Sequence, residues 1–159
     1  MSKLLVIILM GSKADMDHCT KISEACKQYG LDTVLRIASA HKTPEHALSI
    51  LKEYEADERP KVYITVAGRS NALSGFTDGS VSAPVIACPP SSDSFGGADV
   101  FSSLRMPSGI APAVVLEPAN AALLAAKIFG VANAEVREQV KLSQKRAADK
   151  IVEDDASVQ

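Results

Sequence analysis

Short apolar segments alternate with amphipathic helical patterns, and this alternation constrains the fold more than any other feature of the chain. The first segment, Leu4–Met10, reads LLVIILM and has no polar residue, which is typical of a strand covered on both faces of its sheet. Apolar residues then recur at helical spacing up to Gly30, where a helix is expected to end. Strands separated by helices favour a parallel sheet with right-handed crossovers and helices on both faces. We expect strands at Leu4–Met10, Thr33–Ala38, Val62–Ala67, Pro84–Ala87 and Ala113–Leu116, and helices from Met16, from about Thr43, over Pro118–Phe129 and from Ala134.

The last expected helix carries one apolar stripe between charged faces. A stripe of this kind at the end of a chain often packs on another surface, and a second subunit is one candidate. Its members are Val136, Val140, Ser143, Ala147 and Ile151.

Composition narrows the class of protein. The 159 residues are 47% apolar and 23% charged, which suits one soluble domain with a sizeable core. A net charge of −2 and the lack of Trp argue against nucleic acid or an anionic membrane as a partner. The first apolar run is too short to span a bilayer. The three cysteines, Cys19, Cys26 and Cys88, form no Cys-x-x-Cys pattern, which favours a reducing cytoplasm with no disulfide framework and no zinc site.

Polar clusters follow four of the expected strands at the point where each strand ends. In open parallel sheets, ligands bind outside the carboxyl ends of the strands, so four clusters at one edge indicate one shared site. The clusters are Gly11-Ser12-Lys13-Ala14-Asp15, Ser39-Ala40-His41-Lys42, Gly68-Arg69-Ser70-Asn71 and Cys88-Pro89-Pro90-Ser91-Ser92-Asp93.

The first cluster has two interpretations. Ser12 followed three residues later by Asp15 fits a capping box, in which each side chain satisfies a free amide of a helix start. The same hydroxyl at a helix start also suits a phosphate or a ribose. The cluster matches neither Gly-x-Gly-x-x-Gly nor a P-loop, which disfavours a dinucleotide or a nucleoside triphosphate.

His41 is the strongest candidate for acid–base chemistry, because an imidazole between a strand end and a helix start can accept a proton and return it. Lys42 and Arg69 are cations at the same edge and suit a dianionic phosphate. We expect His18 to face solvent and His46 to be structural or exposed. Cys88 fits a buried strand-end thiol better than a nucleophile.

Six segments together resemble the phosphoribosylaminoimidazole (AIR) carboxylase family of de novo purine synthesis: GSKAD, SAHKTP, AGRSNALSG, PVIACPP, SSLRMPSG and NAALLAAKIF. The resemblance implies an α/β fold, a flavodoxin-like three-layer αβα sandwich with a central parallel sheet and an extra C-terminal helix. It also implies a single AIR carboxylase domain over residues 1–159, assembly as a homo-octamer and a cytoplasmic location.

The resemblance extends to one branch of the family. Mutases typically read Ser-Ala-His-Arg and Ala-Gly-x-Ala-Ala-His-Leu-Pro-Gly, whereas this chain has Lys42 after His41, Ala72 at the second histidine and Ser74 at the proline. The branch that resembles this chain carboxylates aminoimidazole ribonucleotide with free carbon dioxide, without ATP, to 4-carboxyaminoimidazole ribonucleotide. A mutase acting on N-carboxyaminoimidazole ribonucleotide and a non-catalytic flavodoxin-like module for a phosphorylated ligand or a flavin remain as alternatives.

The resemblance also implies roles for individual residues. The reaction that it implies needs neither a cofactor nor a metal. His41 is then the catalytic residue, and the partners are a phosphoribosyl substrate and carbon dioxide. Ala14 departs from the serine that both branches commonly have. Independently of the resemblance, Asp93 and Asp99 flank Phe95-Gly96-Gly97, and two interpretations of this segment stay open: a flexible lid or an ordinary polar loop. The expected substrate-binding residues are Ser12, Asp15, Ser39, Lys42, Gly68, Arg69 and Ser70, and the expected carbon dioxide pocket comprises Gly68, Asn71, Ala72, Cys88 and Pro89.

Overall fold

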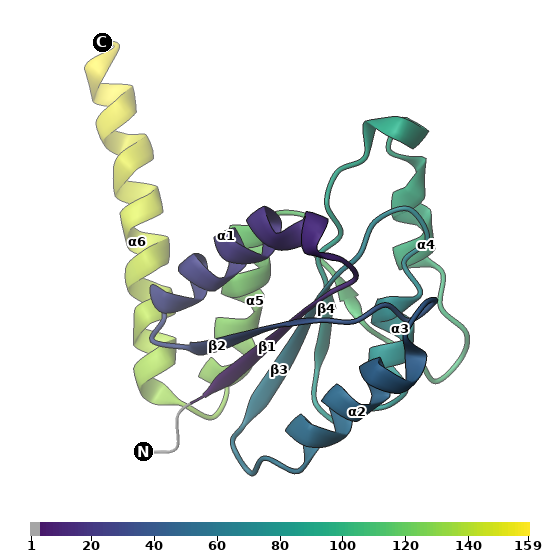
Figure 1. Cartoon of the computed structure of the whole chain (residues 1–159). Helices are drawn as coiled ribbons and strands as arrows, with labels where there is room; N and C mark the ends of the chain where they lie inside the picture. The colour runs from purple at the N-terminus through teal and green to yellow at the C-terminus, as the bar shows by residue number, and fades with distance from the viewer. Residues whose placement is uncertain (1–3) are drawn as a thin grey trace.

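The structure is a computed structural model and describes residues 4–159. Its centre is a sheet of five parallel strands in the order β2-β1-β3-β4-β5 (Figure 1). The strands are β1 (Leu5–Met10), β2 (Asp32–Ile37), β3 (Lys61–Val66), β4 (Val85–Ala87) and β5 (Ala113–Val114). The helices are α1 (Met16–Lys27), α2 (Pro44–Glu55), α3 (Leu73–Asp78), α4 (Phe101–Leu104), α5 (Pro118–Gly130) and α6 (Ala134–Ser157). Three short 3₁₀ turns are η1 (Lys13–Asp15), η2 (Asp93–Phe95) and η3 (Ala98–Val100).

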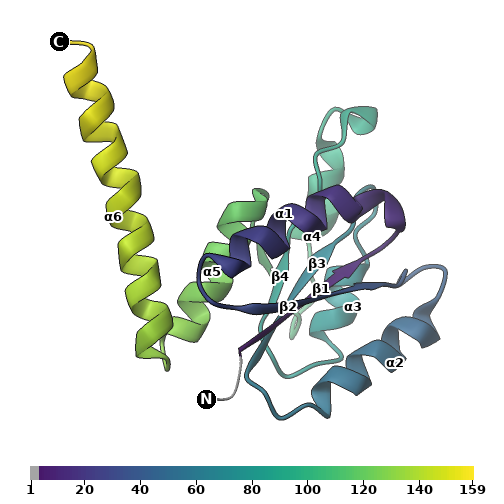
Figure 2. The same ribbon diagram turned by 60° about the vertical axis from the view of Figure 1, so that its left-hand side comes forward.

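The alternation of side chains along β1 explains the three layers. Val6, Ile8 and Met10 lie in a core with α1 and α5, whereas residues such as Ile7 and Leu9 lie in a second core with α2 and α3. Figures 1 and 2 show these helix pairs on opposite faces of the sheet. Because both faces are covered, β1 is apolar throughout and fully buried. The expected three-layer αβα sandwich of flavodoxin-like type is therefore confirmed.

The expected strands agree closely with the observed ones, with shifts of about one residue at most ends. The exception is β5, which covers only Ala113–Val114 of the expected Ala113–Leu116. Helix α3 is not predicted from the sequence. Its six residues include Gly75 and the buried polar residues Ser74 and Thr77, so no apolar stripe marks it as a helix.

Helix α6 begins at an Asn133 cap, whose side chain accepts a hydrogen bond from Val136 N. Val136 and Val140 are buried against the body of the protein, and the hydroxyl of Ser143 is 3.3 Å from that of Tyr29. Beyond this point the helix leaves the body, as Figure 2 shows. Ile151, from the same stripe, is 69% exposed. The stripe therefore packs on its own chain only in its first half.

None of the helices in the described part of the chain is both long enough and apolar enough to cross a membrane.

Candidate functional site

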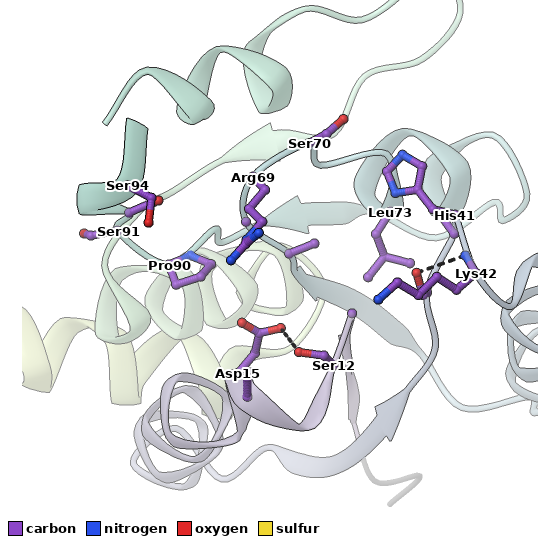
Figure 3. A pocket seen from close by; sticks show the side chains of 17 residues that line it. Ser12, Asp15, His41, Lys42, Arg69, Ser70, Leu73, Pro90, Ser91 and Ser94 are labelled. Carbon is purple, nitrogen blue, oxygen red and sulfur yellow. Dashed lines mark hydrogen bonds between the residues drawn. The ribbon is translucent and has the colours of Figure 1, made fainter. Parts of the chain in front are cut away.

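A cavity of about 570 Å³ opens at the carboxyl edge of the sheet. The ends of β1, β2, β3 and β4 all contribute to its lining, as the position of the polar clusters predicts. Figure 3 shows side chains from these separate loops around one hollow. The cavity brings together eight residues expected at the site: Ser12, Asp15, Ser39, His41, Lys42, Gly68, Arg69 and Ser70.

The loop after β1 supplies Ser12 and Asp15. Ser12 Oγ donates to Asp15 Oδ2 at 3.4 Å, and neither side chain bonds a backbone amide of the helix start. The capping box is therefore not formed. Its two side chains turn toward the cavity instead, where Figure 3 shows them at its base.

The loop after β2 is a compact turn around Ser39 and Thr43. Thr43 N donates to Ser39 O at 2.8 Å, Ser39 N donates to Thr43 Oγ1 at 3.0 Å, and Lys42 N donates to Ser39 Oγ at 3.2 Å. His41 and Lys42 are thereby left exposed at the cavity. In Figure 3 the Lys42 ammonium reaches into the hollow and the His41 ring lies beside Leu73. We call these two loops, Ser12–Asp15 and Ser39–Thr43, the local wall, because their hydrogen bonds join residues three or four apart.

The loop after β3, Gly68–Asn71, is held by a distant segment of the chain. Arg69 N donates to Asp99 Oδ2 at 2.9 Å, and Asn71 N donates to Ser102 Oγ at 2.9 Å. The buried side chain of Asn71 donates to Ser103 Oγ at 2.9 Å. We call Gly68–Asn71 the bridged wall, because its partners lie about thirty residues away in the sequence.

Arg69 extends from the bridged wall into the cavity. Figure 3 shows its guanidinium between Pro90 and Asp15, whereas the Ser70 hydroxyl points to the outer rim. Arg69 and Lys42 place two positive charges at the mouth, and the hydroxyls of Ser12 and Ser39 add donors. Cationic and hydroxyl donors in this arrangement suit a phosphate.

Four residues expected in the carbon dioxide pocket lie outside this cavity. Asn71 is 3% exposed and uses its amide oxygen to accept a hydrogen bond from Ser74 N at 3.1 Å. Ala72 caps the start of α3. Pro89 lines a neighbouring cavity of about 310 Å³, together with Asp99 and Leu116. The fifth expected residue, Gly68, lines the main cavity.

Cys88 is fully buried, so its interpretation as a strand-end thiol is confirmed. Its Sγ donates to Leu116 O at 3.5 Å, and burial raises the pKa of the thiol to about 12. The thiol is therefore protonated near neutral pH. A nucleophilic role requires the thiolate, which this environment disfavours.

The expectation that His18 faces solvent is wrong. Its ring is half-buried, Nε2 donates to Cys88 O at 3.1 Å, and the same nitrogen is 3.4 Å from Cys88 Sγ. Burial lowers the pKa of His18 below its ordinary value of 6.5. The residue lies one turn into α1, so helical position alone did not reveal that the turn after β4 would cover it. His18 thus anchors the Cys88-Pro89-Pro90 turn.

Pro90, Ser91 and Ser92 from the turn after β4 also line the cavity, as the fourth polar cluster indicates, although no individual role was expected for them. Leu73 and Ser94 line it too and were missed in the sequence, because neither belongs to a polar cluster at a strand end. A Cβ atom placed on Gly68 would be 3.5 Å from Pro90 Cγ, so the turn after β4 lies beside the bridged wall.

Within residues 4–159, no group of three or more His, Cys, Asp or Glu side chains is arranged to hold a metal ion. The polar groups of the cavity are instead donors for an anion, with Asp15 as the acceptor. Such a site can orient a phosphorylated ribose, whose phosphate accepts and whose hydroxyls donate hydrogen bonds.

Known proteins resemble this chain in sequence and in fold. The phosphoribosylaminoimidazole carboxylase of Treponema denticola is 62% identical over 154 residues, which are 97% of each chain. The enzyme of the same name from Archaeoglobus fulgidus is 60% identical over 134 residues, 84% of this chain and 73% of that one. The crystal structure of Treponema denticola PurE superposes with a TM-score of 0.97 at 60% identity and covers 99% of both chains. The sequence profile described as AIR carboxylase matches residues 5–150, and the chain belongs to the AIR carboxylase family.

Proposed function

We propose that this chain carboxylates aminoimidazole ribonucleotide with free carbon dioxide and so forms 4-carboxyaminoimidazole ribonucleotide for purine synthesis, without ATP. The observation that carries the proposal is the convergence of His41, Lys42, Asp15 and Arg69 on one cavity in a chain of the AIR carboxylase family. An acid–base group, cations for a phosphate and a carboxylate for ribose hydroxyls are what this substrate requires.

In this proposal the phosphate and the ribose of the substrate bind against the local wall. Lys42 and Ser12 donate to the phosphate, with Ser39 as a further hydroxyl donor, while the Asp15 carboxylate accepts from the ribose hydroxyls. Ser70, in the bridged wall, can add a donor to the phosphate only after its hydroxyl turns in from the rim. The Ser12–Asp15 bond is long at 3.4 Å, so both side chains are free to exchange it for a ligand. Arg69 adds a second charge from the bridged wall. Ala14 offers no hydroxyl, so the phosphate relies on these other donors.

The chemistry needs one proton transfer. The substrate ring is enamine-like, so carbon 4 attacks the carbon of carbon dioxide and a new carbon–carbon bond forms while one C=O π pair moves to oxygen. His41 then takes the proton from carbon 4, which restores the aromatic ring, and returns it in the reverse reaction. His41 is exposed at the cavity and beside Lys42, which leaves its ring accessible to a substrate anchored by its phosphate.

Carbon dioxide is small and apolar, so a dry, shaped pocket has to hold it next to carbon 4. We place that pocket between Gly68 and the Cys88-Pro89-Pro90 turn, where the prolines exclude water and main-chain amides stabilise the developing carboxylate. Asn71, Ala72 and Cys88 then form its outer layer. The support is the close approach of Pro90 to Gly68 and the burial of Asn71 and Cys88 behind them.

Asn71 of the bridged wall, together with Ala72 and Ser74 just after it, is the basis for proposing the carbon-dioxide-using branch. Ala72 stands where a mutase has its second histidine, and a methyl group can neither donate nor accept a proton. Ser74 stands at the mutase proline, and its backbone N–H donates to Asn71 Oδ1 at 3.1 Å. A proline there has no N–H to donate, so this hydrogen bond to Asn71 requires a residue other than proline at position 74.

We also propose that residues 1–159 act as one domain, that the protein assembles as a homo-octamer and that it works in the cytoplasm. The outer half of α6 supports assembly, since Ile151 and Val152 are 69% and 70% exposed on a helix that leaves the body. Light scattering at several protein concentrations measures the assembly. A monomer at all concentrations contradicts it.

A product assay tests the function. Aminoimidazole ribonucleotide and bicarbonate, without ATP, should yield the 4-carboxy product with the native chain and at a much lower rate with His41→Asn. A matched control is His46→Asn, which changes an exposed histidine outside the cavity lining and should leave the rate unchanged. Binding of the substrate without any product supports the non-catalytic module instead, and a yellow protein with flavin absorbance supports the flavin alternative.

A further inference from the structure

The main chain of Arg69 lies in the left-handed region, with φ at 61°. Glycine is the usual residue there, because a Cβ atom crowds the backbone in this conformation. Within residues 4–159, Arg69 is the one non-glycine residue with a positive φ. Such a conformation persists where surrounding contacts hold it, and it often marks a functional position.

The contacts that hold Arg69 come from a single distant segment. The N–H of Arg69 donates to the Asp99 carboxylate at 2.9 Å, which is a charge-assisted hydrogen bond. On its carbonyl side, Ser102 Oγ lies 3.4 Å from Arg69 O and 2.7 Å from Asp99 O. Asp99 Oδ2 would also be 3.8 Å from a Cβ atom on Gly68, so the carboxylate packs on the residue before Arg69. Both peptides of Arg69 are thus tied to Asp99 and Ser102.

This main-chain conformation determines where the Arg69 side chain goes. Figure 3 shows the guanidinium inside the cavity, on the side of Asp15 and Pro90. In the part of the chain that the structure describes, the guanidinium has no hydrogen-bond or ion-pair partner, so its donors are open to a ligand. A right-handed or extended Arg69 would turn its Cα–Cβ bond in another direction, so the left-handed backbone contributes to the placement of the guanidinium.

We infer that Asp99 is a positioning residue for this site: its carboxylate fixes Arg69 in the left-handed conformation that aims the guanidinium at the phosphorylated substrate. The chain has an arginine at a position whose backbone conformation favours glycine. The hydrogen bond from Arg69 N to Asp99 offsets the cost of that conformation. The inference deepens the proposed function and rests on it for the identity of the ligand. The hold of Asp99 on Arg69 does not depend on the ligand.

The first experiment measures that hold directly, without substrate. Amide hydrogen exchange at Arg69 should be about 10-fold faster in Asp99→Ala, because the N–H loses a charged acceptor. Trypsin should cut after Arg69 faster in the same variant. Asp99→Asn keeps a neutral acceptor and should fall between the native chain and Asp99→Ala. The matched control is Asp93→Ala, which removes an exposed aspartate of the same segment and should leave exchange at Arg69 unchanged.

The second experiment measures the consequence for the reaction. Asp99→Ala should raise KM about 10-fold with little change in kcat, since Arg69 binds the phosphate equally in substrate and transition state. Arg69→Ala should raise KM by a similar factor. The double variant should show about a 10-fold effect and not about 100-fold, because Asp99 acts through Arg69.

Three results separate the possible failures. Unchanged exchange at Arg69 in a folded Asp99→Ala or Asp99→Asn protein overturns the inference. So does a double variant whose loss equals the product of the single losses, which would mean that Asp99 acts independently of Arg69. If the native chain forms no 4-carboxy product, the proposed function fails, and the exchange experiment still decides the role of Asp99.

Discussion

The two walls of the cavity are built in different ways. The local wall stands on the ends of β1 and β2 and is shaped by bonds such as Lys42 N to Ser39 Oγ, three residues apart. The bridged wall follows β3 and is shaped by hydrogen bonds to Asp99, Ser102 and Ser103. In each of these bonds the two partners are 30 to 32 residues apart in the sequence. The local wall therefore keeps its shape through short-range contacts, whereas the bridged wall depends on the correct docking of a separate segment.

This difference matches a division of labour in the proposed reaction. The local wall carries the proposed phosphate donors and the proposed acid–base histidine. The bridged wall carries Ser70 and Asn71, two of the residues in which this chain departs from the mutase pattern, and Ala72 follows it directly. A change in reaction type can thus reside in a loop whose shape is set from elsewhere in the chain. Variants of the two walls should therefore damage different properties of the protein.

The largest effect should come from the local wall. His41→Asn removes the proposed base and should lower kcat by about 100-fold or more, the typical contribution of general acid–base catalysis. Because His41 is exposed, the melting temperature should stay close to that of the native chain. Steady-state kinetics and thermal unfolding of the same preparations measure both quantities. Near-native kcat in a folded variant contradicts the assignment of the base.

Asn71→Ala, in the bridged wall, should lower the free energy of unfolding. It leaves Ser103 Oγ and Ser74 N without their buried partner, at a cost of about 2–4 kcal/mol in the free energy of unfolding. The matched variant in the local wall is Ser39→Ala, which loses one exposed bond and should cost less than about 1 kcal/mol. Urea unfolding of both proteins makes the comparison. Equal losses would show that the two walls are not held differently.

Lys42→Ala should weaken the substrate complex and leave the folding of the local wall intact. The loss in kcat/KM should be about 1–3 kcal/mol and should appear chiefly in KM, because the phosphate is remote from carbon 4. The matched control is Lys13→Ala. It also removes an exposed lysine, but from the loop after β1 and from outside the cavity lining. An unchanged KM in Lys42→Ala, or an equal rise in Lys13→Ala, argues against Lys42 as a phosphate ligand.

The smallest effect concerns the turn after β4, which lies beside the bridged wall. Because burial lowers the pKa of His18 below 6.5, the unfolded chain binds a proton there more readily than the folded one. The contribution of His18 to stability is therefore present above pH 6.5 and is lost as the pH falls through 6.5 toward the folded pKa. Each unit of difference in the His18 pKa between the folded and unfolded chains corresponds to about 1.4 kcal/mol in the free energy of unfolding.

His18→Gln tests this dependence, since glutamine retains an N–H donor for Cys88 O but does not titrate. Urea unfolding between about pH 5 and pH 8 should show a flatter profile for the variant than for the native chain. The difference between the two profiles isolates His18 from the other ionisable groups. Identical profiles would mean that His18 has the same pKa in the folded and unfolded chains.

The sequence predicted the fold and the local wall because both follow from short-range patterns. The apolar run of β1 indicates a strand covered on both faces, and parallel strands bring their carboxyl ends to one edge. This rule groups Ser12, Asp15, His41 and Lys42 at one site. Their mutual arrangement then needs only turns of three to five residues, such as Ser39–Thr43.

The same strand-end pattern placed Gly68, Arg69 and Ser70 of the bridged wall at the site, but it did not predict the contacts that hold this wall. Nothing in the spacing of Arg69 and Asp99 indicates that a carboxylate binds an amide 30 residues away. His18 was misplaced for the same reason, since its partner Cys88 is 70 residues distant. Asn71 is polar and was expected to face a ligand, yet its two side-chain bonds inside the protein explain its burial. Long-range polar contacts of this kind appear only when the fold brings the segments together.

The proposed use of free carbon dioxide in this cavity is tested most directly by one measurement. The rate of formation of 4-carboxyaminoimidazole ribonucleotide is followed at increasing dissolved carbon dioxide, with carbonic anhydrase present to keep it in equilibrium with bicarbonate. The same assay is run with the N-carboxy compound after free carbon dioxide has been removed. We expect the rate from aminoimidazole ribonucleotide to rise with carbon dioxide, and the N-carboxy compound to react only as fast as it decays spontaneously. Direct conversion of the N-carboxy compound, at a rate unaffected by removing free carbon dioxide, contradicts the account.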